Sequence, residues 1–128
     1  MSEYMWWFEQ AMRDLRKAVN ALSTEDYDAV AFWCHQAVEK GLKALLLSRG
    51  YVARGHNLVD LGRRIKEELS LNIDEIMDDL MELNPHYTIS RYPNAANAPP
   101  YQIYNRSKAE DLISRAKRVL NWIKQFLH

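Results

Sequence analysis

The chain has 128 residues, the length of one domain of ordinary size, so a second domain is not expected. Its 48% hydrophobic and 27% charged residues are typical of a globular protein and exclude a disordered chain. The 17 basic and 17 acidic residues cancel, which excludes a strong overall field that would attract nucleic acid or a membrane surface.

The first predicted helix covers residues 3–22, where apolar side chains recur every three or four positions. Trp6 falls outside this apolar stripe, so it is either exposed or in contact with another subunit. Ser23 and Thr24 follow, and either hydroxyl is a suitable cap for the next helix.

The second predicted helix, residues 27–49, is apolar around nearly its whole circumference, and such a helix has to be enclosed by others. Its apolar runs fall short of the ~18 residues of a membrane span. Gly41 is expected to allow close approach of a neighbouring helix, and Gly50 supplies the stop. One narrow strip of this helix is polar: His35, Gln36, Glu39, Lys40 and Lys43.

A short linker at 51–56 leads to a third predicted helix at 57–69. A fourth is predicted at 73–84, with Asn72 as its cap and Pro85 as its end. Residues 85–104 then lose the helical pattern and hold all 4 prolines and four of the 7 tyrosines. This composition predicts a long loop, and a connection of this length inside a compact domain is often functional.

The last predicted helix is opened by Asn105 or by Ser107, and Ser107 with Glu110 fits the capping-box pattern. Five helices without a strand predict an all-α protein. We expect a five-helix up-and-down bundle in a single domain, residues 1–128, with the long Pro/Tyr-rich loop before the last helix.

Residues 31–46 (AFWCHQAVEKGLKALL), 55–61 (GHNLVDL) and 90–94 (SRYPN) together resemble the HEPN domain family. The resemblance covers essentially the full chain and implies an antiparallel helical bundle that forms homodimers. Small stand-alone members are often encoded beside a minimal nucleotidyltransferase, in two-component systems of toxin–antitoxin type. Some members are metal-independent ribonucleases whose signature is an arginine followed, after four to six residues, by a histidine.

That signature is not intact after Arg91, because the next residues are Tyr-Pro-Asn-Ala-Ala-Asn-Ala-Pro. Metal-free RNA cleavage needs a group that carries protons near neutral pH, and arginine cannot give up its proton there. Arg49 and His56 have the spacing of the signature but lie between the second and third helices. Catalysis is therefore uncertain and disfavoured; a ribonuclease would combine Arg91 with an unconventional base such as His35 or His56.

Arg91, Tyr92 and Asn94 are the first candidates for binding, because a proline-stiffened loop can present a guanidinium and a phenol to a phosphate or base. In the structural alternative, Tyr92 and Pro93 pack the loop down and Arg91 pairs with an acid of the fourth helix.

The polar strip is the second candidate, because His35, Lys40 and Lys43 can line a cleft with Arg91. In the structural alternative, Glu39 and Lys43 form a favourable i,i+4 pair and His35 makes a buried hydrogen bond. His56 precedes a helix N-terminus, which is a general anion site. The alternative, which the sequence favours, is that His56 and Asn57 cap this helix start or pack against it.

Four tyrosines of the predicted loop either stack on bases or pack over the bundle: Tyr87, Tyr92, Tyr101 and Tyr104. The histidines are scattered, so no metal site and no cofactor are expected. The single cysteine, Cys34, cannot form an internal disulfide and is expected to be a buried apolar residue. With no signal sequence at the start, the cytoplasm is the expected compartment.

The resemblance implies a dimeric protein that works with a nucleotidyltransferase, and the candidate residues favour one that holds a nucleotide or RNA phosphate. The residues expected to bind it are Arg91, Tyr92, Asn94, His35, Lys40, Lys43 and His56. Two alternatives stay open: a metal-independent toxin ribonuclease, and a non-catalytic helical scaffold.

Overall fold

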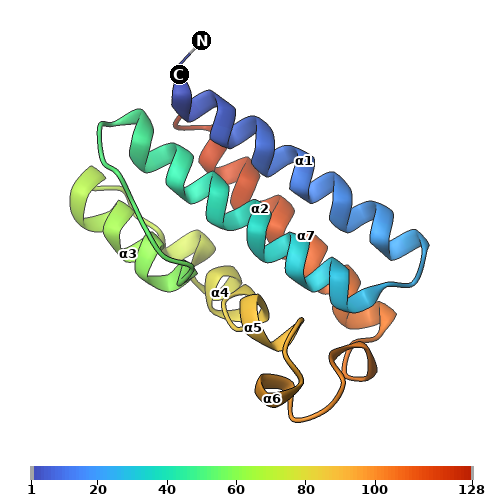
Figure 1. Ribbon diagram of the computed structural model, residues 1–128. Helices are drawn as coiled ribbons and strands as arrows, with labels where there is room; N and C mark the ends of the chain where they lie inside the picture. The colour runs from blue at the N-terminus through green and yellow to red at the C-terminus, as the bar shows by residue number, and fades with distance from the viewer. Residues whose placement is uncertain (1, 128) are drawn as a thin grey trace.

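The computed structural model describes residues 2–127, and its regular structure is helical, with no strand in that range (Figure 1). The elements are α1 (Glu3–Ser23), α2 (Tyr27–Ser48), α3 (Leu58–Leu69), α4 (Asp74–Leu83), α5 (His86–Ile89), α6 (Pro93–Ala96), the 3-10 turn η1 (Pro100–Gln102) and α7 (Arg106–Lys124). The all-α class is confirmed. No helix in the described range is both long enough and apolar enough to cross a membrane.

The predicted count of five helices is wrong, because short helices occupy the segment that was expected to be a loop. Pro93 is the first residue of α6, Pro100 is the first residue of η1, and Pro85 is the cap residue of α5. Proline prevents a helix from continuing through it but is tolerated in the first turn, where its N–H is not needed. The prolines therefore limit these helices to one turn without preventing them.

The helix directions differ from the predicted up-and-down order. Helices α2 and α7 meet start to start and end to end. At their starts, the Arg106 guanidinium carbon lies 5.7 Å from the Tyr27 ring, and just after their ends, Arg49 Nη2 donates to the carbonyl oxygen of Phe126 at 2.8 Å. The two helices are therefore parallel, and α1 runs opposite to both (Figure 1). Helices that alternate strictly in direction are joined by short turns. Here residues 49–57 run back along α2 and residues 84–105 cross the end of the bundle, so the helices that follow these connections need not alternate.

The core surrounds α2, which contacts α1, α7, α3 and α5. Its apolar residues from Val30 to Leu46 are almost all buried, as predicted for an enclosed helix. A Cβ atom on Gly41 would lie 2.6 Å from Leu120 Cδ2, so the expected close approach of a neighbouring helix is confirmed, and that neighbour is α7.

The caps decide between the predicted helix starts. Asn105 Oδ1 accepts the backbone N–H of Lys108 at 2.8 Å, so Asn105 caps α7 and the capping box at Ser107 is wrong. The predicted cap of α2 is also wrong, because the hydroxyls of Ser23 and Thr24 donate back to carbonyls of α1. The residue before α2 is Asp26, reached through Glu25 with a φ of 63°.

Candidate functional site

The single turn α5 places the Tyr87 ring against α2 and against the linker that precedes α3. The ring stacks on His56 with a centroid separation of 4.0 Å and an interplanar angle of 13°. Its hydroxyl lies 3.0 Å from His56 Nε2, and the His35 ring centroid lies 5.3 Å away. Tyr87 therefore brings together two histidines that belong to different segments of the chain.

Arg91 lies one helical turn after Tyr87 and folds back over it. The Arg91 Nε atom donates to the carbonyl oxygen of Tyr87 at 2.9 Å. Its guanidinium carbon lies 4.7 Å from the Phe32 ring, 4.5 Å from the Tyr87 ring and 4.7 Å from the Tyr92 ring. Since His56 occupies one face of Tyr87, the guanidinium lies over the other. We call Glu39, His56, Tyr87 and Arg91 the Tyr87 stack.

Arg91 has no carboxylate partner among residues 2–127, so the alternative in which it pairs with an acid of α4 is not observed. Within the same range its two terminal nitrogens make no hydrogen bond to protein. The side chain is exposed, and its terminal N–H groups are available to a ligand.

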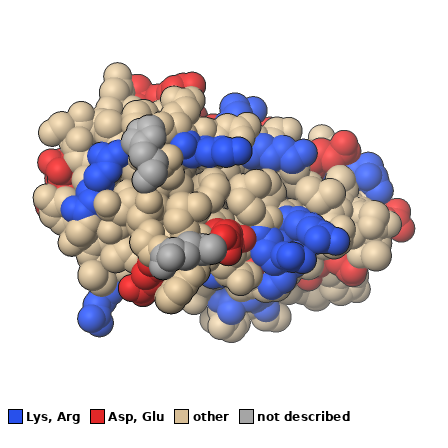
Figure 2. All heavy atoms as spheres, turned by 90° about the horizontal axis from the view of Figure 1, so that it is seen from above, with Lys and Arg blue, Asp and Glu red and all other residues tan. Residues whose placement is uncertain are grey.

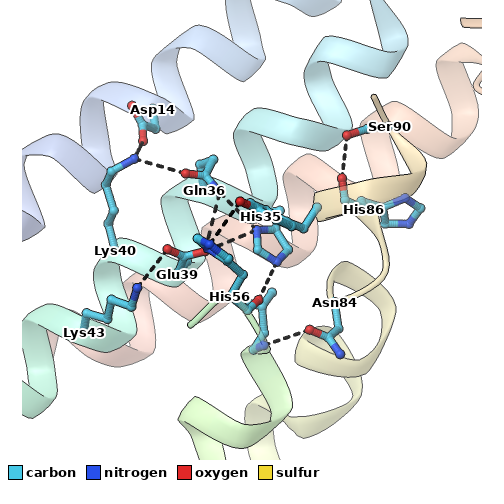
Figure 3. A network of polar contacts seen from close by, with 12 residues as sticks. Asp14, His35, Gln36, Glu39, Lys40, Lys43, His56, Asn84, His86 and Ser90 are labelled. Atoms are coloured by element: carbon cyan, nitrogen blue, oxygen red, sulfur yellow. Dashed lines mark hydrogen bonds and ion pairs between the residues drawn. The ribbon is translucent and has the colours of Figure 1, made fainter. Parts of the chain in front are cut away.

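His56 is held from behind by Glu39, as Figure 3 shows. The His56 side chain is 50% exposed, and its Nδ1 atom donates to Glu39 Oε1 at 2.9 Å. The other Glu39 oxygen accepts from Lys43 Nζ at 3.0 Å, which is the i,i+4 pair expected from the sequence. Glu39 itself is almost fully buried.

His35 lies beneath His56 and Tyr87 and is completely buried. Its Nε2 atom donates to the backbone carbonyl of His56 at 3.0 Å, which fixes the linker to α2. Burial lowers the pKa of His35 to about 4, and the nearby His56 and Arg91 lower it further, against the opposing effect of Glu39. His35 is therefore neutral at pH 7, and the 3.8 Å separation between its Nδ1 and Glu39 is not an ion pair.

The two lysines of the polar strip are neutralised by carboxylates. Lys40 turns toward α1 and contacts the buried Asp14, with Gln36 Oε1 at 3.5 Å (Figure 3). Lys43 pairs with Glu39, and in the described part of the chain neither lysine contacts Arg91. The structure thus brings His35 and His56 together with Arg91 and directs Lys40 elsewhere.

The remaining aromatic candidates divide by exposure. Tyr92 is 47% exposed beside Arg91, and Tyr101 is 66% exposed. Tyr104 is buried, and its hydroxyl lies 2.6 Å from His86 Nδ1. Asn94 is exposed in α6, after Tyr92. Only Tyr92 and Tyr101 retain a ring surface that another molecule can cover.

A model of the HEPN domain family matches residues 4–126. The chain belongs to the HEPN domain family. It is 30% identical, over 129 aligned positions, to the Methanocaldococcus jannaschii protein named "Putative toxin MJ1304", covering 93% of this chain and 84% of the relative.

Solved structures resemble this HEPN domain over all or nearly all of its length. TT1696 from Thermus thermophilus has a TM-score of 0.92 and 34% identity, covering 99% of this chain and 100% of that one. ST0689, an archaeal HEPN homologue, has a TM-score of 0.82 and 33% identity, covering 100% of both. A HEPN domain protein from Thermotoga maritima has a TM-score of 0.75 and 26% identity, covering 94% and 96%.

Sequence reasoning about this HEPN domain missed the role of Tyr87 as the residue on which the others stack. One signal was present, because Tyr87 and Arg91 are four residues apart and share a face if the segment is helical. The surrounding prolines concealed that helix. Phe32 was read only as a core residue, yet it supplies one of the three rings around the guanidinium.

No metal centre is formed by residues 2–127, where no group of three His, Cys, Asp or Glu side chains is arranged to hold a metal ion. Cys34 is fully buried, and burial raises the pKa of its thiol to about 12. The thiol is therefore protonated and unreactive, and the chemistry of this site depends on His56, Tyr87 and Arg91.

Proposed function

We propose that this HEPN domain is a dimeric binding protein that holds a nucleotide or RNA phosphate at the Tyr87 stack. In this proposal it works with a nucleotidyltransferase partner in a two-component system of toxin–antitoxin type. The observation that carries the proposal is the Arg91 guanidinium, which is exposed, ringed by aromatic side chains and without a carboxylate partner among the described residues.

The geometry of Arg91 suits a phosphate for a physical reason. Guanidinium presents its donors in a planar fork, and aromatic faces and the Tyr87 carbonyl fix the orientation of that plane before a ligand arrives. A preorganised cation loses little side-chain entropy on binding. The exposed Tyr92 ring next to it is a surface on which a base can stack.

Calorimetry with adenosine 5′-monophosphate and with a short single-stranded RNA tests this binding. We expect Arg91→Ala to weaken binding by at least about tenfold, because charge-assisted hydrogen bonds contribute ~1.5–3 kcal/mol. Arg63→Ala is the matched control, since Arg63 is an exposed arginine of α3. Equal affinities for both variants and the wild type would leave the scaffold alternative as the better account.

The partner and the dimer need separate tests. The toxin–antitoxin setting is supported by the family and by the name of the archaeal relative, and co-purification with a nucleotidyltransferase encoded next to this gene tests it.

The dimer is supported by exposed apolar residues on α1, with Trp6 at 58% and Met12 at 45%. Light scattering should give twice the 15.1 kDa of one chain.

A second candidate, the metal-independent ribonuclease, is favoured by one observation: His56 is exposed and oriented by Glu39, across the Tyr87 ring from the arginine. Of the two bases considered from the sequence, His35 is fully buried and His56 is not. RNA degradation in EDTA that is lost in both His56→Gln and Arg91→Ala would establish this activity. Intact RNA after long incubation would remove it.

A further inference from the structure

Tyr87 and Arg91 belong to a stretch of chain that is too short to hold its own shape. Helix α5 has 4 residues, His86–Ile89, and Arg91 lies just beyond its end. Helices shorter than ~12 residues are marginal on their own in water, because the first turn costs more conformational entropy than its few hydrogen bonds return. The orientation of the Tyr87 stack therefore depends on what attaches α5 to the rest of the protein.

Adjacent side chains of α5 attach it to two different parts of the fold. Tyr87 packs toward α2 and the linker before α3, where its ring stacks on His56. The ring of His86 lies apart from this cluster, as Figure 3 shows, and its Nδ1 atom is 2.6 Å from the hydroxyl of Tyr104. Tyr104 directly precedes Asn105, the cap of α7. Helix α5 is thus tied to α2 by Tyr87 and to the start of α7 by His86.

The geometry between His86 and Tyr104 is that of a hydrogen bond between buried groups. The two rings are inclined by 62° with their centroids 5.5 Å apart, so they meet at an edge and the hydroxyl can approach the ring nitrogen. Burial lowers the pKa of His86 to about 4, and nearby Lys108 lowers it further, while burial raises the pKa of the Tyr104 hydroxyl. Both groups are therefore neutral at pH 7, and the bond does not depend on a charge on either.

This bond closes the connection between α4 and α7 near both of its ends. His86 and Tyr104 are 18 residues apart in the sequence, and a loop whose ends are held together is restricted in the conformations that it can adopt. Tyr87, Arg91 and Tyr92 all lie inside the closed loop. Opening the loop at Tyr104 would therefore affect these three residues together.

Apolar packing alone does not set the angle at which α5 lies. Ile89 is partly buried and packs against the core, so it also holds the turn down. Burial of apolar surface has no preferred direction, whereas a hydrogen bond needs its donor and acceptor to be aligned. The bond between His86 and Tyr104 therefore fixes the rotation of α5, which the contact of Ile89 does not.

We propose that Tyr104 is a positioning residue for the Tyr87 stack. Through its bond to His86 it holds α5 at the angle at which the Arg91 guanidinium lies over the Tyr87 ring and presents its terminal N–H groups to an anion. The proposal rests on the proposed function, because it explains how Arg91 is ordered before an anion arrives. Apparent affinity falls with the fraction of molecules in the binding conformation, so loosening α5 weakens binding without removing a group that touches the ligand.

Hydrogen exchange followed by NMR tests the attachment of α5 without a ligand. Three protons report on it: the backbone N–H groups of Arg91 and Tyr92, which donate to the Thr88 carbonyl at 3.1 and 3.0 Å, and the Arg91 Nε–H, which donates to the Tyr87 carbonyl at 2.9 Å. Tyr104→Phe keeps the ring and removes the hydroxyl that contacts His86. We expect exchange of the three protons to become about tenfold faster.

Asn105→Ala is the matched control, because it removes a hydrogen bond made by the next residue and weakens the same junction. It should accelerate exchange of the Lys108 amide, which donates to Asn105, and leave the three protons after α5 unchanged. A loss of overall stability would accelerate exchange alike in both variants, so the difference between them isolates positioning.

Calorimetry with sulfate, at one pH, tests the effect on binding. We expect Tyr104→Phe to weaken sulfate binding by about threefold and Asn105→Ala to leave it unchanged. Unchanged exchange in Tyr104→Phe would overturn the positioning role, and faster exchange with an unchanged sulfate affinity would overturn its effect on binding. A wild type that binds no sulfate, nucleotide or RNA, with faster exchange in Tyr104→Phe, would remove the proposed function and leave Tyr104 as the residue that positions Arg91.

Discussion

Arg91 illustrates how a charged side chain is held in place without an oppositely charged partner. Each contact of its guanidinium with an aromatic ring contributes only ~0.5–1 kcal/mol at an exposed site. Three such contacts and one hydrogen bond to a carbonyl act together on the same planar group. Because none of these contacts uses the terminal N–H groups, the side chain is ordered and remains able to bind.

Two buried histidines make the stability of the protein sensitive to acid. Burial lowers the pKa of both His35 and His86 from 6.5 to about 4. Above pH 6.5 these rings are neutral in the folded and the unfolded chain and have no effect. As the pH falls from 6.5 to 4, the unfolded chain binds protons first, so the free energy of unfolding decreases by up to ~1.4 kcal/mol per pH unit for each histidine.

Urea unfolding at pH 7, 6 and 5 measures this decrease. Replacing one of the pair, in His86→Gln, should reduce the slope by about half relative to the wild type. Equal free energies of unfolding at pH 7 and pH 5 would show that the two rings are not kept neutral by burial.

At the scale of single elements, the long helices follow their apolar periodicity closely. A helix at residues 27–49 was predicted because apolar residues lie around nearly its whole circumference, and α2 spans Tyr27–Ser48. The start of α7 was ambiguous, because Asn105 and Ser107 both have side chains that accept from a backbone N–H. The structure shows that Asn105 does so and that Ser107 lies inside the first turn.

The capping assignment can be tested with two alanine variants. Asn105→Ala should lower the free energy of unfolding by about 1 kcal/mol, since it leaves a backbone N–H of the first turn without its acceptor. Ser107→Ala, two residues away in the same turn, should change it by less than ~0.5 kcal/mol. Thermal melts followed by circular dichroism compare the two, and a larger loss for Ser107→Ala would contradict the cap.

The candidate site was less predictable than the helices, for reasons that particular residues make clear. Arg91 and His56 were found because their chemistry suits a phosphate and because short motifs resemble those of a family. Their proximity depends on the path of residues 49–57 and on α5, and single-residue preferences carry no information about either. Tyr87 was considered only as one of four loop tyrosines, and its stacking between His56 and Arg91 was missed because Pro85 and Pro93 suppress the local helical pattern on which its alignment with Arg91 depends.

At the scale of the whole molecule, the buried carboxylate of Asp79 in α4 forms ion pairs with two arginines of α7. Asp79 accepts from Arg115 Nη1 at 3.1 Å and from Arg118 Nη2 at 2.8 Å. These pairs hold the α3–α4 side of the protein against the layer formed by α1, α2 and α7 (Figure 1). The face drawn in Figure 2 shows more basic than acidic surface, with neighbouring Lys and Arg side chains that have no acidic group between them.

Removing the carboxylate should loosen this junction. Asp79→Asn leaves two arginines without their common partner, and we expect the free energy of unfolding to fall by ~1–3 kcal/mol. Asp111→Asn is the control, because Asp111 is 52% exposed and pairs with Arg115 alone, so its loss should be below ~1 kcal/mol. Denaturant titrations in which the two variants lose equal stability would refute the special role of Asp79.

The shared direction of α2 and α7 has an electrostatic consequence. Parallel neighbours align their macrodipoles, so the partial negative charges of both carboxyl ends accumulate at one end of the molecule, an arrangement in which like charges repel. The start of α1, with its partial positive charge, lies at that end, and Arg49 donates to the Phe126 carbonyl there. The partial positive charge at the start of α1 therefore offsets the partial negative charges at the ends of α2 and α7, and α1 also covers the apolar sides of these two helices.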